Sequence, residues 1–97
     1  MSESITVYVS IGNSDDKLPQ REWSSYVADF RTVMEKYAAT IYGVWFSGPE
    51  SPYQNACVAA AVLGDDIGAL RADLLDVRQT YDQDSVAWAV TRTTEFI

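Results

Sequence analysis

Polar residues able to bind cations or transfer protons gather in three short segments of this chain. The candidates are Asn13, Asp15, Asp16, Gln54, Asn55, Asp82, Asp84 and Ser85. Carboxylate and amide oxygens are the ligands that Ca²⁺ and Mg²⁺ prefer, and paired carboxylates can divide the acid and base roles when their surroundings separate their pKa values. The spacing of these acids matches no established cation-binding loop, so the sequence predicts no metal site.

The absence of histidine and the presence of a single cysteine exclude several chemistries. Without an imidazole there is no Ser-His-Asp or Cys-His couple and no histidine-containing zinc site. One cysteine forms neither an internal disulfide nor a thiolate metal cage. Cys57 lies in an apolar run without a basic neighbour, so we expect a packing role. The sequence predicts no cofactor, and it leaves enzymatic activity open while favouring a non-enzymatic role.

Hydrophobic periodicity predicts the elements that position these segments. Apolar and hydroxyl-bearing residues alternate over residues 5–11, which is the period of a half-buried strand. Apolar residues recur every three or four positions over 19–38 and again over 67–81, which predicts two helices, the second capped by Asp65 or Asp66. Further strands are predicted over residues 41–46, 56–63 and 86–91.

This order of elements predicts a single α+β domain over residues 1–97. Strands joined by a helix run parallel with a right-handed crossover, whereas the short connection between the second and third strands predicts a hairpin. A ferredoxin-like βαββαβ fold satisfies both rules, with a four-stranded antiparallel sheet of order 4-1-3-2 and two helices on one face. The residues expected to meet the helices are Val7, Val9, Val44, Phe46, Val58, Ala60, Val62, Val86, Trp88 and Val90.

The opposite face of this sheet is expected to be open and free of charge. Its predicted members are Thr6, Tyr8, Ser10, Gly43, Trp45, Cys57, Ala59, Ala61, Ala87, Ala89 and Thr91. An uncharged face with aromatic rings is typical of a contact surface, and symmetric dimers are the commonest homo-oligomers. We therefore predict a homodimer formed through Tyr8, Trp45, Cys57, Ala59 and Ala89.

A pocket between two open faces is one alternative to a dry dimer interface, and an exposed apolar face without a partner is another. Dimeric α+β barrels of about this size resemble the chain in topology. This resemblance implies a cofactor-independent enzyme or a domain that binds a small molecule.

The same topology places the loops over residues 12–17, 47–55 and 81–85 at one edge of the molecule. The eight polar candidates named at the outset would then form one rim, with Lys17 and Arg21 as nearby counter-charges. Two interpretations of the rim stay open. Functional groups gather on loops that a rigid scaffold holds, which favours a site for a partner or ligand. Asn, Asp, Ser and Gly also form turns, which favours a purely structural role.

The net charge of −7 opposes nucleic-acid binding. RNA-binding modules with this strand order stack bases on aromatic residues of their two central strands, yet residues 55–61 contain no aromatic or basic side chain. An acidic inhibitor or immunity-type protein for a basic partner is a further alternative. The first four residues lack the pattern of a signal peptide, and no apolar run is long enough to span a membrane, so we expect a cytoplasmic protein without membrane contact.

Overall fold

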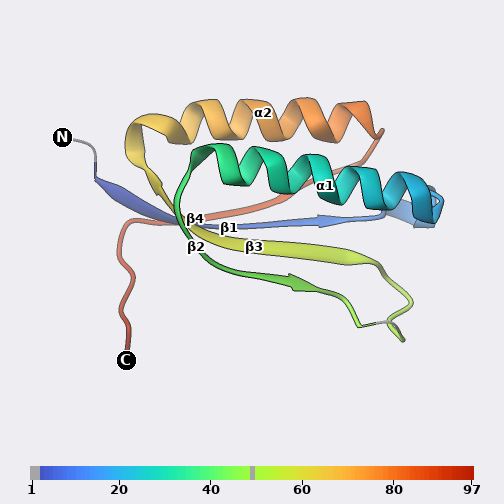
Figure 1. Cartoon of the computed structure of the whole chain (residues 1–97), viewed down its shortest axis with the longest axis horizontal. Helices are drawn as coiled ribbons and strands as arrows, with labels where there is room; N and C mark the ends of the chain where they lie inside the picture. The colour runs from blue at the N-terminus through green and yellow to red at the C-terminus, as the bar shows by residue number, and fades with distance from the viewer. Residues whose placement is uncertain (1–2, 49) are drawn as a thin grey trace.

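The computed structural model describes residues 3–48 and 50–97 as a four-stranded antiparallel sheet with two helices on one face (Figure 1). The elements are β1 (Ser4–Gly12), α1 (Gln20–Tyr37), β2 (Ala38–Phe46), β3 (Asn55–Leu63), α2 (Ile67–Thr80) and β4 (Ala87–Thr91). The sheet order is β2-β3-β1-β4, which confirms the predicted ferredoxin-like α+β fold. Pro49 of the predicted loop 47–55 and the first two residues lie outside the described residues.

The starts of two elements differ from the prediction. β2 begins at Ala38, directly after α1, because the long strand β3 offers a pairing partner for Ala38 at Val62. A short 3-10 turn, Gly64–Asp66, leads into α2, and Asp66 at its start makes no side-chain cap hydrogen bond. The predicted cap is therefore wrong for Asp66, because residues of a 3-10 turn, and not an extended residue, precede the helix.

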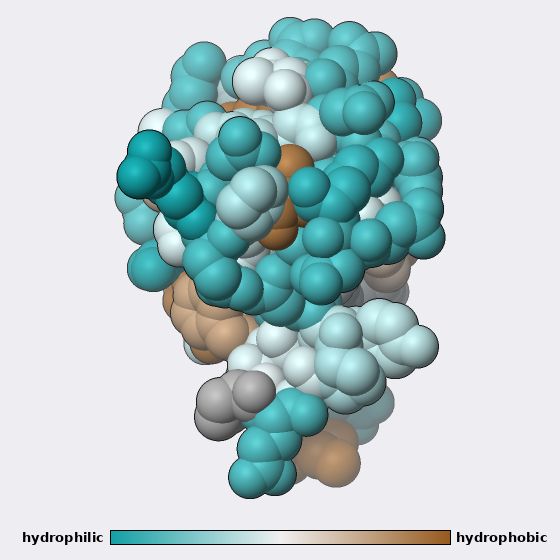
Figure 2. Space-filling view, turned by 90° about the vertical axis from the view of Figure 1, so that its right-hand side faces the viewer, coloured by the Kyte–Doolittle hydropathy of each residue, from teal (hydrophilic) through white to brown (hydrophobic). Residues whose placement is uncertain are grey.

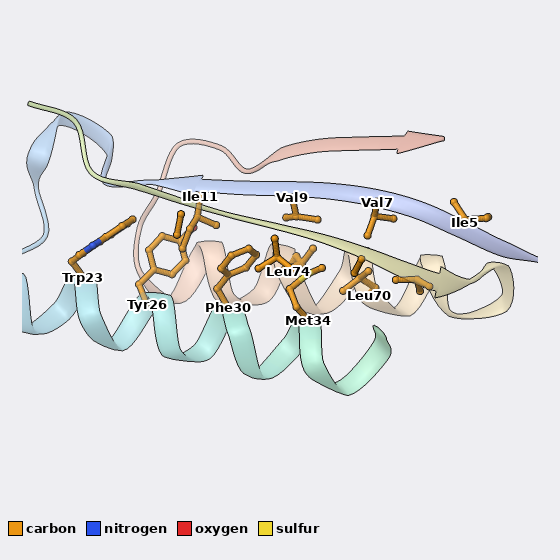
Figure 3. Close-up of a cluster of buried hydrophobic side chains, with 14 of the residues drawn as sticks. Ile5, Val7, Val9, Ile11, Trp23, Tyr26, Phe30, Met34, Leu70 and Leu74 are labelled. Carbon is orange, nitrogen blue, oxygen red and sulfur yellow. The ribbon is translucent and has the colours of Figure 1, made fainter. Parts of the chain in front are cut away.

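The core lies between the helix pair and the sheet, where side chains from both layers meet (Figure 3). Val7 and Val9 of β1 are fully buried and point toward the helices. Phe30 and Met34 of α1, one turn apart, and Leu70 of α2 close the layer from the other side. Each large side chain contributes on the order of 1.5 to 3 kcal/mol when buried. This core fixes the two central strands, and with them both candidate surfaces described below.

Two residues predicted for the core are exposed. Phe46 and Val90 keep 54% and 43% of their surface accessible, although their pairing with Ala56 and Val7 places them on the helix side of the sheet. They lie at the ends of the edge strands β2 and β4, where the helix layer no longer covers the sheet. The prediction of burial was wrong for these two residues, because strand periodicity identifies a face but not how far its cover extends.

Candidate functional site

Residues paired across the strands form the open face of the sheet, on the side away from the helices. One row runs Trp45, Cys57, Ser10, Ala87 and the next runs Gly43, Ala59, Tyr8, Ala89. Directly paired residues share a face, so the rows bring together all five residues predicted for the contact surface. The strand residues of these rows include no charged side chain.

Two aromatic rings project from this face over a layer of small residues. Tyr8 and Trp45 are 45% and 54% exposed, whereas Ala59, which pairs with Tyr8, is buried. The indole of Trp45 lies over Gly43, where an added Cβ would come within 2.8 Å of its ring. Burial raises the pKa of the Cys57 thiol, which keeps it protonated and unreactive at neutral pH. The open face is therefore apolar, uncharged and chemically inert.

The segment after β4, residues 92–97, extends the apolar surface beyond the strands. It leaves the sheet on the side opposite the helices (Figure 1). The hydroxyls of Thr94 and Thr6 are hydrogen-bonded, and the Phe96 ring meets the Tyr42 ring edge-on at a centroid distance of 5.8 Å. Phe96 and Ile97 are highly exposed. From the sequence, residues 95–97 are expected only to extend the last strand or to fray, because a short tail has no periodicity that would predict these contacts.

The three polar loops do meet at one end of the molecule, which is mostly hydrophilic (Figure 2). The Asn13 amide nitrogen donates to the Leu18 carbonyl and to Gln54 Oε1, both at 2.9 Å, and its oxygen accepts from the Leu18 amide at 2.9 Å. Lys17 donates to the Asp82 carbonyl at 2.7 Å and lies 3.7 Å from the Asp84 carboxylate. The three hydrogen bonds of Asn13 indicate that its side chain stabilises the folded loops.

Gln83 joins two of these loops from a buried position. Its Oε1 accepts from the Ser14 amide at 2.7 Å, and its Nε2 donates to the Tyr81 carbonyl at 3.0 Å. A buried amide with both ends paired acts as a structural tie. Among the sequence-predicted rim residues, Asn55 donates its backbone amide to Ser47 Oγ at 3.1 Å, and Ser85 is exposed.

The rim aspartates combine exposed carboxylates with strained backbone. Asp15, Asp16 and Asp82 have φ angles of 53°, 52° and 53°, a left-handed conformation that Asp tolerates better than most residues. This explains the choice of aspartate at turns without invoking a ligand. The described residues contain no group of three or more His, Cys, Asp or Glu side chains arranged to hold a metal ion.

A cavity of about 220 Å³ between α2 and β4 was not predicted. Arg71, Arg78 and Trp88 contribute to its lining. A signal was present in the sequence, since Arg71 and Arg78 lie two helical turns apart and share one face of α2. Trp88, however, was expected to fill the core, whereas it is only half-buried. The cavity exists because α2 and β4 do not close fully over one another.

The fold and these surfaces define a small ferredoxin-like α+β domain with an open sheet face. No protein-family model matches the sequence, and comparison with curated proteins finds no significant relative. Among the described residues, no helix has the length and apolar character needed to cross a membrane.

Solved structures share the fold over nearly the whole chain. A DUF3240 family protein from Shewanella baltica OS155 is similar, with a TM-score of 0.60 at 11% identity over 99% of this chain and 96% of the other. A hydroxynitrile lyase from Passiflora edulis gives 0.56 at 10% identity, over 100% and 99% of the two chains. A putative antibiotic biosynthesis monooxygenase from Caulobacter crescentus CB15 gives 0.53 at 9% identity, over 97% and 92%. At such identities the likeness establishes the fold alone.

Proposed function

We propose that the protein functions by self-association, with the open sheet face of one copy packed against the same face of a second copy. The observation that carries the proposal is the absence of charge from the paired rows of this face, although the chain has a net charge of −7. Sheets that face water commonly alternate apolar and polar residues. A face with small residues and the exposed rings of Tyr8 and Trp45 departs from that pattern.

A second copy of the chain is the occupant that this surface fits best. A partner held by charge would need complementary charges, which the strand residues of the face do not offer. A flat sheet face is the same on both copies, so a two-fold axis brings apolar surface onto apolar surface. The acidic side chains elsewhere on the two copies would then stay in solvent.

The area of the face indicates which further residues take part. A third row of paired residues continues the face and runs Thr40, Ala61, Thr6, Thr91. With strands about 4.8 Å apart and a same-face repeat of about 6.7 Å, these three rows across four strands cover roughly 400 Å². A stable interface buries about 800 Å² per partner. Tyr42, Phe96 and Ile97 are exposed apolar residues at the margin of the face. We therefore include residues 92–97 in the proposed interface.

The test uses Ala89→Glu with Ala72→Glu as a matched control. Ala89 is exposed on the open face, so the monomer should tolerate a glutamate there. Ala59 is buried, and a glutamate at that position would disturb the monomer itself. Ala72 is exposed on α2, in the helix layer on the other side of the sheet. Burying a carboxylate against a second copy should weaken association by at least about a hundredfold. Light scattering after size exclusion should show a monomer for Ala89→Glu and an unchanged mass for Ala72→Glu. Equal masses for both variants would refute the proposal.

Enclosure of a small molecule between the two faces is a second candidate function. It is supported by the names of two fold neighbours, a hydroxynitrile lyase and a putative antibiotic biosynthesis monooxygenase, which are enzyme names. Native mass spectrometry of the purified protein would detect a bound small molecule in the dimer. Location in the cytoplasm stays a prediction, and fractionation of the host cell would test it.

A further inference from the structure

The cavity between α2 and β4 has a composition that indicates a specific class of ligand. Its α2 wall consists of Arg71, Leu74, Leu75 and Arg78, which share one helix face, and Trp88 of β4 lies across from them. The wall is thus apolar at its centre and carries an arginine at each end. Trp88 pairs with the buried Val9, so the cavity opens on the helix side of the sheet. Its role is therefore independent of the proposed contact through the open face.

Arg78 retains unused hydrogen-bonding capacity. Nη1 of Arg78 donates to the backbone carbonyls of Gln83 at 3.3 Å and Asp84 at 3.1 Å, which fixes the position of the guanidinium. Its Nε is buried and has no hydrogen-bond partner among the described residues. A buried donor of this kind is uncommon in a folded protein.

Neither arginine is neutralised by a carboxylate within the described residues. The basic residues that form salt bridges there are Lys17, Arg31, Lys36 and Arg92. Asp84 also lines the cavity, but its carboxylate lies 3.7 Å from Lys17 on the rim. In a chain with twice as many acidic as basic residues, 14 against 7, a cavity with two unpaired arginines is a local positive site.

We propose that this cavity binds a small monocarboxylate with a single aromatic or branched apolar group. An apolar cavity of about 150 Å³ accommodates benzene, so 220 Å³ has room for one ring and a short acid side chain. The guanidinium fork suits a carboxylate because it can donate two parallel hydrogen bonds. Trp88 and Leu74 offer the ring an apolar surface, and Ser85 supplies a hydroxyl at the lining.

Phenylacetate is the probe, and phenylacetamide is its neutral counterpart of nearly equal shape. Two-dimensional NMR of the wild-type protein follows the indole N–H of Trp88, assigned with Trp88→Phe, while calorimetry measures affinity. Because binding free energy is limited by the number of non-hydrogen atoms, a ligand with roughly ten of them should have a dissociation constant of about 1 mM. We expect a saturable shift of the Trp88 signal with phenylacetate and at least about tenfold weaker binding of phenylacetamide.

Arg71→Gln and Arg21→Gln form the matched pair of variants. Both arginines are exposed, but Arg21 lies on α1 and does not line the cavity. Arg71→Gln should weaken phenylacetate binding about tenfold and leave phenylacetamide binding unchanged. Arg21→Gln should alter neither. The proposal is overturned by the lack of a saturable Trp88 shift up to about 10 mM phenylacetate. Equal affinity for acid and amide, or an unchanged affinity in Arg71→Gln, overturns it as well.

Discussion

Replacing Tyr26 by phenylalanine should stabilise the protein at neutral pH. Tyr26 is 1% exposed, and its ring stacks on that of Tyr81 at a centroid distance of 4.9 Å and meets the edge of Trp23 at 6.0 Å. Its hydroxyl is buried without a hydrogen-bond partner among the described residues. Phenylalanine keeps the ring contacts and removes a polar group whose unpaired burial costs roughly 1 to 3 kcal/mol. We expect the free energy of unfolding to rise by about 1 kcal/mol, the lower end of that range.

The same substitution should remove part of the sensitivity to alkali. Burial raises the pKa of Tyr26 from 10.0 to about 12, against the opposing effect of the Arg78 charge. The folded state therefore holds the phenolic proton more tightly than the unfolded state does. The resulting stabilisation is complete below pH 10 and is lost as the pH rises toward 12. Two pKa units correspond to about 3 kcal/mol, and Tyr26→Phe should lack this loss.

Urea denaturation at pH 7 and at intervals between pH 10 and 12 measures both effects. At pH 7 the control is Tyr81→Phe, because the Tyr81 hydroxyl donates to Asp29 at 2.6 Å and its removal should lower the free energy of unfolding. A Tyr26→Phe variant less stable than the wild type at pH 7 would show that the hydroxyl has a partner. An alkaline loss equal to that of the wild type would contradict the assignment of the raised pKa to burial.

Three further predictions concern the rim, the helix pair and the open face. Asn13→Ala removes the side-chain hydrogen bonds to Leu18 and Gln54 and should lower the free energy of unfolding, measured by urea denaturation, by about 1 to 2 kcal/mol. An unchanged free energy of unfolding would contradict this structural role of Asn13. The hydrogen bond from Tyr37 lowers the pKa of Asp73, so its stabilisation is complete above the usual value of 3.8 and is lost as the pH falls through the lower folded pKa. Asp73→Asn should abolish that acid-dependent loss in thermal melts, and an unchanged acid profile would contradict it. In Gly43→Ala, a Cβ within 2.8 Å of the Trp45 ring should displace the indole, and acrylamide should then quench Trp45 fluorescence more strongly than in the wild type.

The sequence was sufficient to predict the fold because burial leaves a recognisable pattern in each element, which is a period in most of them and an unbroken apolar run over residues 56–63. The alternation around Val7 and Val9 and the helical spacing that includes Phe30 and Met34 correspond directly to the buried side chains of the structure. Strand parity also placed Tyr8 and Trp45 on one face, and the topology brought the polar loops together at one end. These predictions need only local periodicity and rules of strand connection.

The remainder depends on contacts that periodicity does not encode. The exposure of Phe46 follows from where the helix layer ends, and the tie between Gln83 and Ser14 joins residues far apart in sequence. The cavity beside Arg71 and Arg78 depends on the distance between α2 and β4. Whether the rim recognises a partner stays a prediction, because its aspartates suit turns and recognition equally well.

Sedimentation equilibrium of the wild-type protein over a range of concentrations tests the central claim most directly. Self-association through the open face predicts a mass approaching twice 10.8 kDa as the concentration rises. The dimer mass should also be unchanged at high salt, because the proposed contact is apolar and not ionic. A mass of 10.8 kDa at every concentration would contradict the account.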